Sequence, residues 1–203
     1  MDPSVAITAF VALFVIIDPI GLTPVFVALT RGASGRARRG IAIRACLTGV
    51  ALLTVFGLAG EAVLNFVGIS MPAFRISGGI LLFITALDML FERRSQRREG
   101  QTAEHDDPSV FPLAMPLIAG PGAMATMILL AGQSGGDPLH LLMVHLVMLG
   151  VVGLAFILFL AAAPLERALG HTGTLVISRL LGMLLAALSV QFVLDGLRDF
   201  GVI

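Results

Sequence analysis

Six apolar stretches, each long enough to cross a bilayer as a helix, constrain this chain more than any other feature. Crossing the hydrocarbon core takes roughly 20 mostly apolar residues. The qualifying stretches cover residues 5–29, 41–63, 67–91, 109–131, 139–163 and 175–197. Hydrophobic residues make up 57% of the 203 positions and charged residues only 13%, a composition typical of membrane proteins. We therefore predict an all-α, polytopic protein with six transmembrane helices, a single transmembrane domain (1–203) embedded in the lipid bilayer.

The placement of arginine predicts the orientation of these helices. All thirteen basic residues are arginines, and ten of them lie in or beside the first, third and fifth connections. These three connections share one side of a six-helix arrangement. Short connections rich in arginine stay in the cytoplasm. We expect the loop at residues 92–108 to be cytoplasmic and both termini to lie outside.

Two of the six stretches carry helix-breaking residues near their middle. The first contains Asp18 and Pro19, and the fourth contains Gly120 and Pro121. Proline inside a helix removes a backbone donor and clashes with the preceding turn. It is favoured instead at the first position of a helix, directly after an N-cap residue. Each of these two stretches is therefore predicted to form two half-helices, with the second beginning at mid-membrane.

The two breaks belong to a longer internal similarity. Pro121 follows Pro19 by 102 residues, and "RLLGMLLAALS" from Arg179 resembles "RISGGILLFIT" from Arg75 at an offset of 104. The halves are residues 1–91 and 109–203, each with three helices. An odd number of helices gives two tandem halves opposite orientations, which is an inverted-topology repeat and typical of secondary transporters. The N-termini of the two inner half-helices would then meet head to head at the bilayer centre.

The two half-helix starts offer different chemistry to a ligand. A helix N-terminus attracts anions, and Gly120 has no side chain to occupy its donors, so the N–H groups of Gly122 and Ala123 can take a carboxylate. Thr126 can add a hydroxyl. At the other break, Asp18 either faces an ammonium group or cation, or only caps its own half-helix. The Gly-Pro-Gly turn has a similar alternative as a packing kink. A small zwitterion suits the pair, and the candidate substrate-binding residues are Asp18, Gly21, Thr23, Gly120, Gly122, Ala123 and Thr126.

A second group of polar residues lies in the third and sixth stretches. These are candidates for lining a cavity or forming a gate: Arg75, Ser77, Thr85, Arg179, Ser189 and Gln191. The alternative for the two arginines is that they extend to the membrane interface. The alternative for the neutral residues is hydrogen bonding between neighbouring helices.

Several functional classes find no support in the sequence. No nucleophile–base motif, phosphate loop or metalloprotease motif is present, so we predict neither an enzyme nor a bound cofactor. His140 and His145 are not spaced as metal ligands, and a net charge of zero argues against a nucleic-acid partner. Without a nucleotide-binding motif, transport would draw on exchange or on a gradient of a coupling ion, proton or sodium.

Three motifs resemble the MarC family of bacterial inner-membrane proteins: "LFVIIDPIGLTPVFVALT", "RISGGILLFITALDML" and "FPLAMPLIAGPGAMATMI". The family is grouped with amino-acid exporters of the LysE type. The resemblance implies six membrane helices, both termini periplasmic, and transport of alanine- or glycine-sized amino acids. It places the family motif "DPIG" on Asp18–Gly21 and the family motif "AGPGA" on Ala119–Ala123. We expect a secondary transporter that exports small neutral amino acids. The alternatives are a channel-like path for a small ion or solute, with Asp18 as a charged constriction, and a membrane scaffold without transport.

Overall fold

The computed structural model describes residues 3–30, 32–91, 108–133, 135 and 137–202, and within them all regular structure is helical. The helical elements are α1 (Pro3–Ile17), α2 (Pro19–Leu29), α3 (Gly35–Val67), α4 (Met71–Leu90), η1 (Ser109–Ile118), α6 (Pro121–Gly132), α7 (Pro138–Leu160) and α8 (Ala162–Asp199). Five candidate membrane spans, the first of which combines α1 and α2, are long and apolar enough to cross a bilayer, and the pair η1–α6, bent by 53°, makes up to six. This count agrees with the six predicted stretches.

Several helices extend beyond their predicted bounds. Helix α3 begins at Gly35, after the N-cap Ser34, rather than at 41, and ends where Gly68 adopts a φ of 83°. Helix α8 begins at Ala162 rather than at 175, and Gly170 interrupts it with φ 61° and ψ 179°. The last span therefore covers Thr172–Asp199. Hydropathy marks only the apolar middle of such helices, whereas caps and glycine set their ends.

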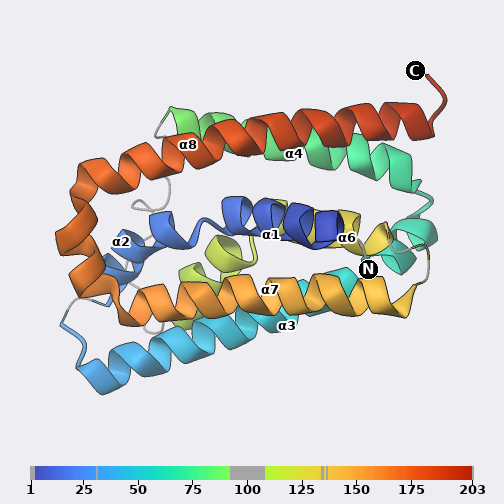
Figure 1. The fold of residues 1–203 in the computed structure, drawn as a ribbon. Coiled ribbons are helices and arrows are strands. Elements are labelled where there is room, and N and C mark those ends of the chain that lie inside the picture. The colour runs from blue at the N-terminus through green and yellow to red at the C-terminus, as the bar shows by residue number, and fades with distance from the viewer. Residues whose placement is uncertain (1–2, 31, 92–107, 134, 136, 203) are drawn as a thin grey trace.

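The broken segments occupy the middle of the bundle. Figure 1 shows α1, α2 and α6 between two flanking helix pairs, with α4 beside α8 on one side and α3 beside α7 on the other. Within each flanking pair the two helices run in opposite directions, and both chain termini lie at the same end of the bundle. The chain thus crosses the length of the bundle an even number of times.

Glycines allow α4 and α8 to pack closely. A Cβ atom on Gly79 would lie 2.8 Å from the backbone oxygen of Ser189, and one on Gly196 would lie 3.0 Å from the backbone oxygen of Pro72. Such contacts exclude any side chain at these positions. Small residues at helix contacts are how membrane helices approach one another, because the surrounding lipid is as apolar as leucine.

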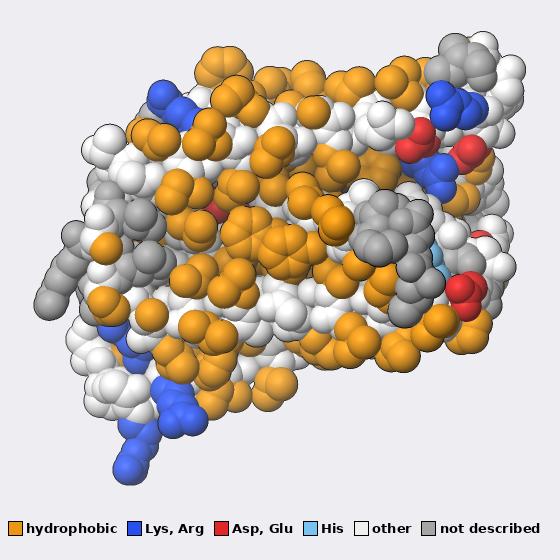
Figure 2. Space-filling view, in the orientation of Figure 1, with side chains coloured by type: hydrophobic (Ala, Val, Ile, Leu, Met, Phe, Trp, Pro, Cys, Tyr) orange, Lys and Arg blue, Asp and Glu red, His pale blue; other side chains and the backbone are white. Residues whose placement is uncertain are grey.

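The outer surface of the bundle is apolar in its middle. Phe66 is 92% exposed and Leu47 is 63% exposed. Figure 2 shows hydrophobic side chains spread over the middle of one face, with arginine side chains gathered toward its two ends. A soluble monomer rarely exposes so continuous an apolar surface. This surface suits contact with lipid.

Candidate functional site

The first break centres on a single aspartate. Helix α1 ends at Ile17, α2 begins at Pro19, and Asp18 between them has φ 54° and ψ 63°. This left-handed conformation costs most residues roughly 1–2 kcal/mol, but Asp tolerates it because its short side chain bonds locally. The Asp18 carboxylate does so by accepting the Gly21 N–H at 3.0 Å. At 2% exposure, Asp18 is a buried N-cap inside the bundle.

Gly21 belongs to this cap. A Cβ atom at Gly21 would lie 2.1 Å from a carboxylate oxygen of Asp18. The space left by the missing side chain is therefore taken up by the aspartate. Gly21 is a candidate substrate-binding residue from the sequence, and in the structure the space beside it holds the Asp18 carboxylate.

The second break lacks the regular half-helix expected before it. Residues 109–118 form the irregular element η1, in which Phe111 (φ −129°, ψ 124°) and Met115 (φ −126°, ψ 121°) are extended. Each directly precedes a proline, whose ring disfavours the helical conformation of the residue before it. The half of the span before this break is thus helical but irregular, because Pro112 and Pro116 interrupt it twice.

The start of α6 has no side-chain cap. Gly120 occupies the N-cap position with φ −77° and makes no capping hydrogen bond. The Met124 N–H donates to the Gly120 carbonyl at 2.9 Å, which closes the first helical turn. The N-cap residue, glycine, offers no side chain to accept the N–H groups of Gly122 and Ala123 in this first turn. A Cβ atom at Gly120 would lie 2.3 Å from the Pro116 carbonyl oxygen, so only glycine fits this position.

Each break is followed by a buried threonine that bonds its own helix. Thr23 donates its hydroxyl to the Pro19 carbonyl at 3.0 Å, and Thr126 donates to the Gly122 carbonyl at 2.8 Å. A hydroxyl has one proton to donate and two lone pairs that accept. Thr126 was expected to add a hydroxyl beside a bound carboxylate. In the structure its proton is already donated, and its oxygen retains the capacity to accept a hydrogen bond.

The two breaks adjoin in space. A Cβ atom on Gly122, the second residue of α6, would lie 2.8 Å from Cδ1 of Ile16 and 3.4 Å from Cδ2 of Leu82. Ile16 lies two residues before Asp18, at the end of α1. The structure therefore brings the end of α1, the start of α6 and the middle of α4 together. Gly122 and Ala123 are both buried there.

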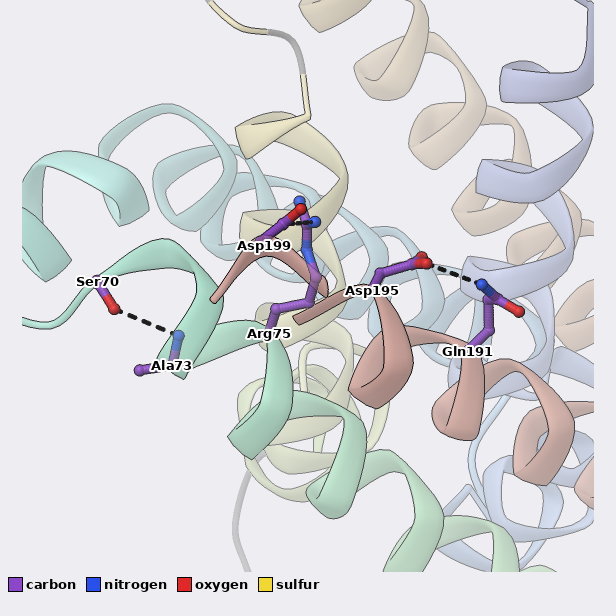
Figure 3. Close-up of polar contacts among 6 residues, drawn as sticks. All are labelled: Ser70, Ala73, Arg75, Gln191, Asp195 and Asp199. Atoms are coloured by element: carbon purple, nitrogen blue, oxygen red, sulfur yellow. Dashed lines mark hydrogen bonds and ion pairs between the residues drawn. The ribbon is translucent and has the colours of Figure 1, made fainter. Parts of the chain in front are cut away.

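Two of the gate candidates lie at the end of the α4–α8 pair. Arg75, in the first turns of α4, forms an ion pair with Asp199 at the end of α8. Gln191 donates from its amide to Asp195 at 2.8 Å. Figure 3 shows these side chains where the start of α4 faces the end of α8. The Arg75–Asp199 ion pair connects the two helices at the same end of the bundle as the chain termini, whereas the Gln191–Asp195 hydrogen bond lies within α8.

The other gate candidates mostly bond within their own helices. Ser77 donates to Phe74 O and Thr85 donates to Leu81 O. Ser189 is buried against Gly79 and donates to Ala186 O at 2.7 Å. The exposed Arg179 lies in the early part of the last span, at the opposite end from Arg75. None of these is brought to the breaks, although Thr85 is one turn from Leu82.

Sequence reasoning missed Ile16 and Leu82. Both are ordinary apolar residues within long apolar runs, so no residue type or spacing distinguishes them. Their importance comes from tertiary packing against Gly122. A glycine directly after a Gly-Pro pair was the only available signal that another element comes close.

Comparison with known proteins shows that the similarity covers nearly the whole chain and is not limited to short motifs. The family model described as MarC family integral membrane protein matches residues 4–200. The chain belongs to the MarC family. A UPF0056 membrane protein of Archaeoglobus fulgidus is 38% identical over 195 residues, covering 94% of this chain and 91% of the relative. This MarC protein is thus a multi-pass integral membrane protein.

Other MarC relatives come from distant bacteria. The UPF0056 inner membrane protein YhgN of Escherichia coli (strain K12) is 35% identical over 192 residues, which cover 95% of each chain. The UPF0056 membrane protein YvbG of Bacillus subtilis (strain 168) is 35% identical over 202 residues, covering 96% of this chain and 95% of the relative. No solved structure matches.

Proposed function

We propose that this MarC protein is an inner-membrane secondary transporter that exports small neutral amino acids of the alanine and glycine class. The observation that carries the proposal is the uncapped start of α6 beside the end of α1. Uncapped helix N-terminal N–H groups bind carboxylates. Asp18 and the threonine oxygens supply negative charge and acceptors for an ammonium group. The two breaks together match both ends of a zwitterion.

The packing around Gly122 favours a small substrate. One added methyl group at this position would already crowd Ile16 and Leu82. A substrate carboxylate that reaches the Gly122 and Ala123 N–H groups therefore has little space for a large side chain beside it. This geometry favours glycine and alanine over bulky amino acids or large amphipathic drugs.

The arrangement of helices supports alternating access by two inverted halves, residues 1–91 and 109–203. The equivalent helices of the two halves, α3 with α7 and α4 with α8, lie side by side and run in opposite directions. Transporters built this way bind substrate near the bilayer midplane and rock one part of the bundle against another. The broken segments between the flanking pairs then form the substrate path.

The Arg75–Asp199 pair is proposed to close one end of that path. It joins α4 to α8 at the end that carries the termini. Arg179 occupies the equivalent place in the second half, at the opposite end. If the pair is a gate, Asp199→Asn raises the labelling of a cysteine introduced at position 16, whereas a pair that only anchors the helix ends leaves labelling unchanged.

The orientation proposed for the bundle follows from its arginines. Both termini are periplasmic, and the loop at residues 92–108, of which residues 92–107 lie outside the described residues, is cytoplasmic. The basic first turns of α3, with Arg36, Arg38 and Arg39, lie at the end of the bundle away from the termini. Labelling in intact cells tests this: a cysteine introduced at position 2 should react with an impermeant reagent and one at position 100 should not.

Counterflow in proteoliposomes tests the function itself. Vesicles loaded with unlabelled alanine should accumulate labelled alanine from outside, with saturation and with competition by glycine. A channel lets label equilibrate without transient accumulation, and a scaffold gives no flux above protein-free vesicles. Either of those two results would refute the proposal.

A further inference from the structure

His145 is an ionisable side chain inside a membrane span. It lies in α7, a helix of 23 residues that starts at Pro138, and is half-buried. Its Nδ1 atom is 2.8 Å from the carbonyl oxygen of Leu141. A carbonyl oxygen only accepts, so Nδ1 carries the proton in this hydrogen bond. In neutral imidazole the other nitrogen is then an unprotonated acceptor.

That second nitrogen is buried without a partner. Nε2 of His145 makes no hydrogen bond with any residue that the structure describes. A Cβ atom on Gly57 of α3 would lie 3.0 Å from Nε2 and 2.9 Å from Cε of Met127 in α6. The histidine ring therefore lies where α3, α6 and α7 meet. A buried polar atom left unpaired calls for an explanation, and ionisable groups within membranes are costly to retain.

Few charges surround this nitrogen. Helix α6 contains no titratable residue, and on α3 the nearest is Glu61, which is exposed and one turn from Gly57. On α7 itself, Nε2 of His140 lies 3.1 Å from the Leu130 carbonyl oxygen and is therefore already engaged. Asp137 caps the start of α7 through the Leu139 N–H. Nε2 of His145 is thus the one buried nitrogen with a vacant lone pair among these groups.

The position of His145 connects it to the proposed substrate site. Met127 lies on α6 five residues after Gly122, which corresponds to about 7.5 Å along the helix. Adding a proton to His145 places a positive charge against the helix whose start is proposed to hold the substrate carboxylate. Protonation and substrate binding therefore act on the same element.

We propose that Nε2 of His145 binds the proton whose movement drives transport. The proton comes from water on the periplasmic side, forms an N–H bond at Nε2, and leaves to cytoplasmic water while one amino acid moves outward. No other bond forms or breaks. This inference rests on the transporter function proposed above and assigns its coupling ion and the residue that carries it.

The test compares two variants of the full-length protein in proteoliposomes. His145→Asn keeps an amide nitrogen near the Nδ1 position for Leu141 O but has no group at the Nε2 position. His140→Gln is the matched control, because it keeps an amide nitrogen for Leu130 O on the same helix. Two fluxes of labelled alanine are measured: counterflow without a pH difference, and accumulation driven by a pH difference with the membrane potential clamped at zero.

The expected results separate coupling from binding. With one proton per substrate, each unit of pH difference sustains an about tenfold alanine gradient in the wild type. His145→Asn should keep counterflow within about twofold while its pH-driven gradient falls to about one, since exchange needs no net proton movement. His140→Gln should retain both fluxes.

Each other outcome overturns a defined part of the argument. Absence of wild-type counterflow refutes the transporter function itself. Wild-type counterflow without pH-driven accumulation, or with accumulation driven by sodium instead, refutes proton coupling. Retained pH-driven accumulation in His145→Asn refutes the assignment to His145, and so does loss of counterflow in a variant that keeps the wild-type melting temperature. If His145→Asn does not fold, His145→Gln is measured against the same criteria.

Discussion

The two chain breaks treat the unpaired N–H groups at the start of a buried helix in opposite ways. At the first, Asp18 supplies a carboxylate that occupies the start of α2, and the chain turns through a left-handed residue. At the second, Gly120 has no side chain to cap the helix and keeps an ordinary φ of −77°. The Pro116 carbonyl packs closely against it. One helix start is therefore capped by the side chain of its own N-cap residue, and the other has no such cap.

This difference teaches that similar motifs need not be equivalent sites. Both breaks place proline at the first helical position and both precede a threonine that bonds its own helix. They differ in the N-cap residue, in its backbone conformation and in the regularity of the element before it. If the proposed site holds a zwitterion, its carboxylate is expected at the start of α6, which has no side-chain cap, rather than at the start of α2.

The largest expected effect is on the geometry of the second break. Gly120→Ala places a methyl group 2.3 Å from the Pro116 carbonyl oxygen, where only backbone movement can relieve the clash. We expect a loss of about 3 kcal/mol in unfolding free energy, measured by denaturant titration in detergent. Gly150→Ala in α7 is the control, since no atom lies within 4 Å of its Cβ position. Equal stability of both variants would show that Gly120 is not tightly enclosed.

The next effect concerns the aspartate of the first break. Asp18→Ala removes the cap, at about 1 kcal/mol, and leaves a residue that tolerates φ 54° poorly, at about 1 kcal/mol more. Asp18→Asn keeps a capping side chain and tolerates the left-handed conformation. Its free energy of unfolding should therefore lie within about 0.5 kcal/mol of the wild-type value.

Transport by Asp18→Asn then isolates the charge. If the carboxylate faces the substrate ammonium group, alanine counterflow falls at least about tenfold although stability is kept. Normal counterflow in this variant would show that Asp18 only caps α2 and that its charge has no role in transport.

A smaller effect is expected at Gly122. The added methyl of Gly122→Ala meets the flexible end of Ile16 at 2.8 Å, and alanine favours the helix by about 1 kcal/mol over glycine. Stability should therefore change little, while alanine binding weakens about tenfold, or about 1.4 kcal/mol. Binding by calorimetry and melting temperature are measured together, with Gly153→Ala as a control in open space on α7. Unchanged binding would mean that the start of α6 does not hold the substrate.

The smallest effect comes from the paired threonines. Thr23→Val and Thr126→Val each remove one buried hydrogen bond to a helix carbonyl, and each should cost about 0.5–1 kcal/mol of stability. If the Thr126 oxygen accepts from the substrate, its variant binds alanine about fivefold more weakly than the Thr23 variant. Equal alanine affinities of the two variants would show that both hydroxyls only stabilise their own helices.

The sequence predicted the positions of both breaks because proline acts locally. Pro19 and Pro121 each begin a helix, as expected from their missing N–H groups. The same rule, applied to the residues before Pro112 and Pro116, would have predicted the irregular η1 segment. The six apolar stretches were evident from composition, whereas their ends depended on Ser34, Gly68 and Gly170.

The proximity of the breaks was beyond sequence reasoning. The contact of Gly122 with Ile16 joins elements about a hundred residues apart, and apolar packing leaves no signature in residue type. The left-handed conformation of Asp18 was likewise not indicated by the sequence, since residues other than glycine rarely adopt it. Similarly, nothing in the spacing of His140 and His145 indicated that one nitrogen is bonded and the other vacant.

The glycine contacts between α4 and α8 have a mechanical consequence. At Gly79, Gly182 and Gly196 the backbones come so close that sliding either helix would drive backbone into backbone. The two helices are therefore expected to move as one rigid body. The glycine contacts hold them together along their length, and the Arg75–Asp199 ion pair joins them at one end. Any motion that preserves these contacts must move the two helices together, and the interruptions of regular helix where the chain could bend are the broken segments at the centre and the kink at Gly170.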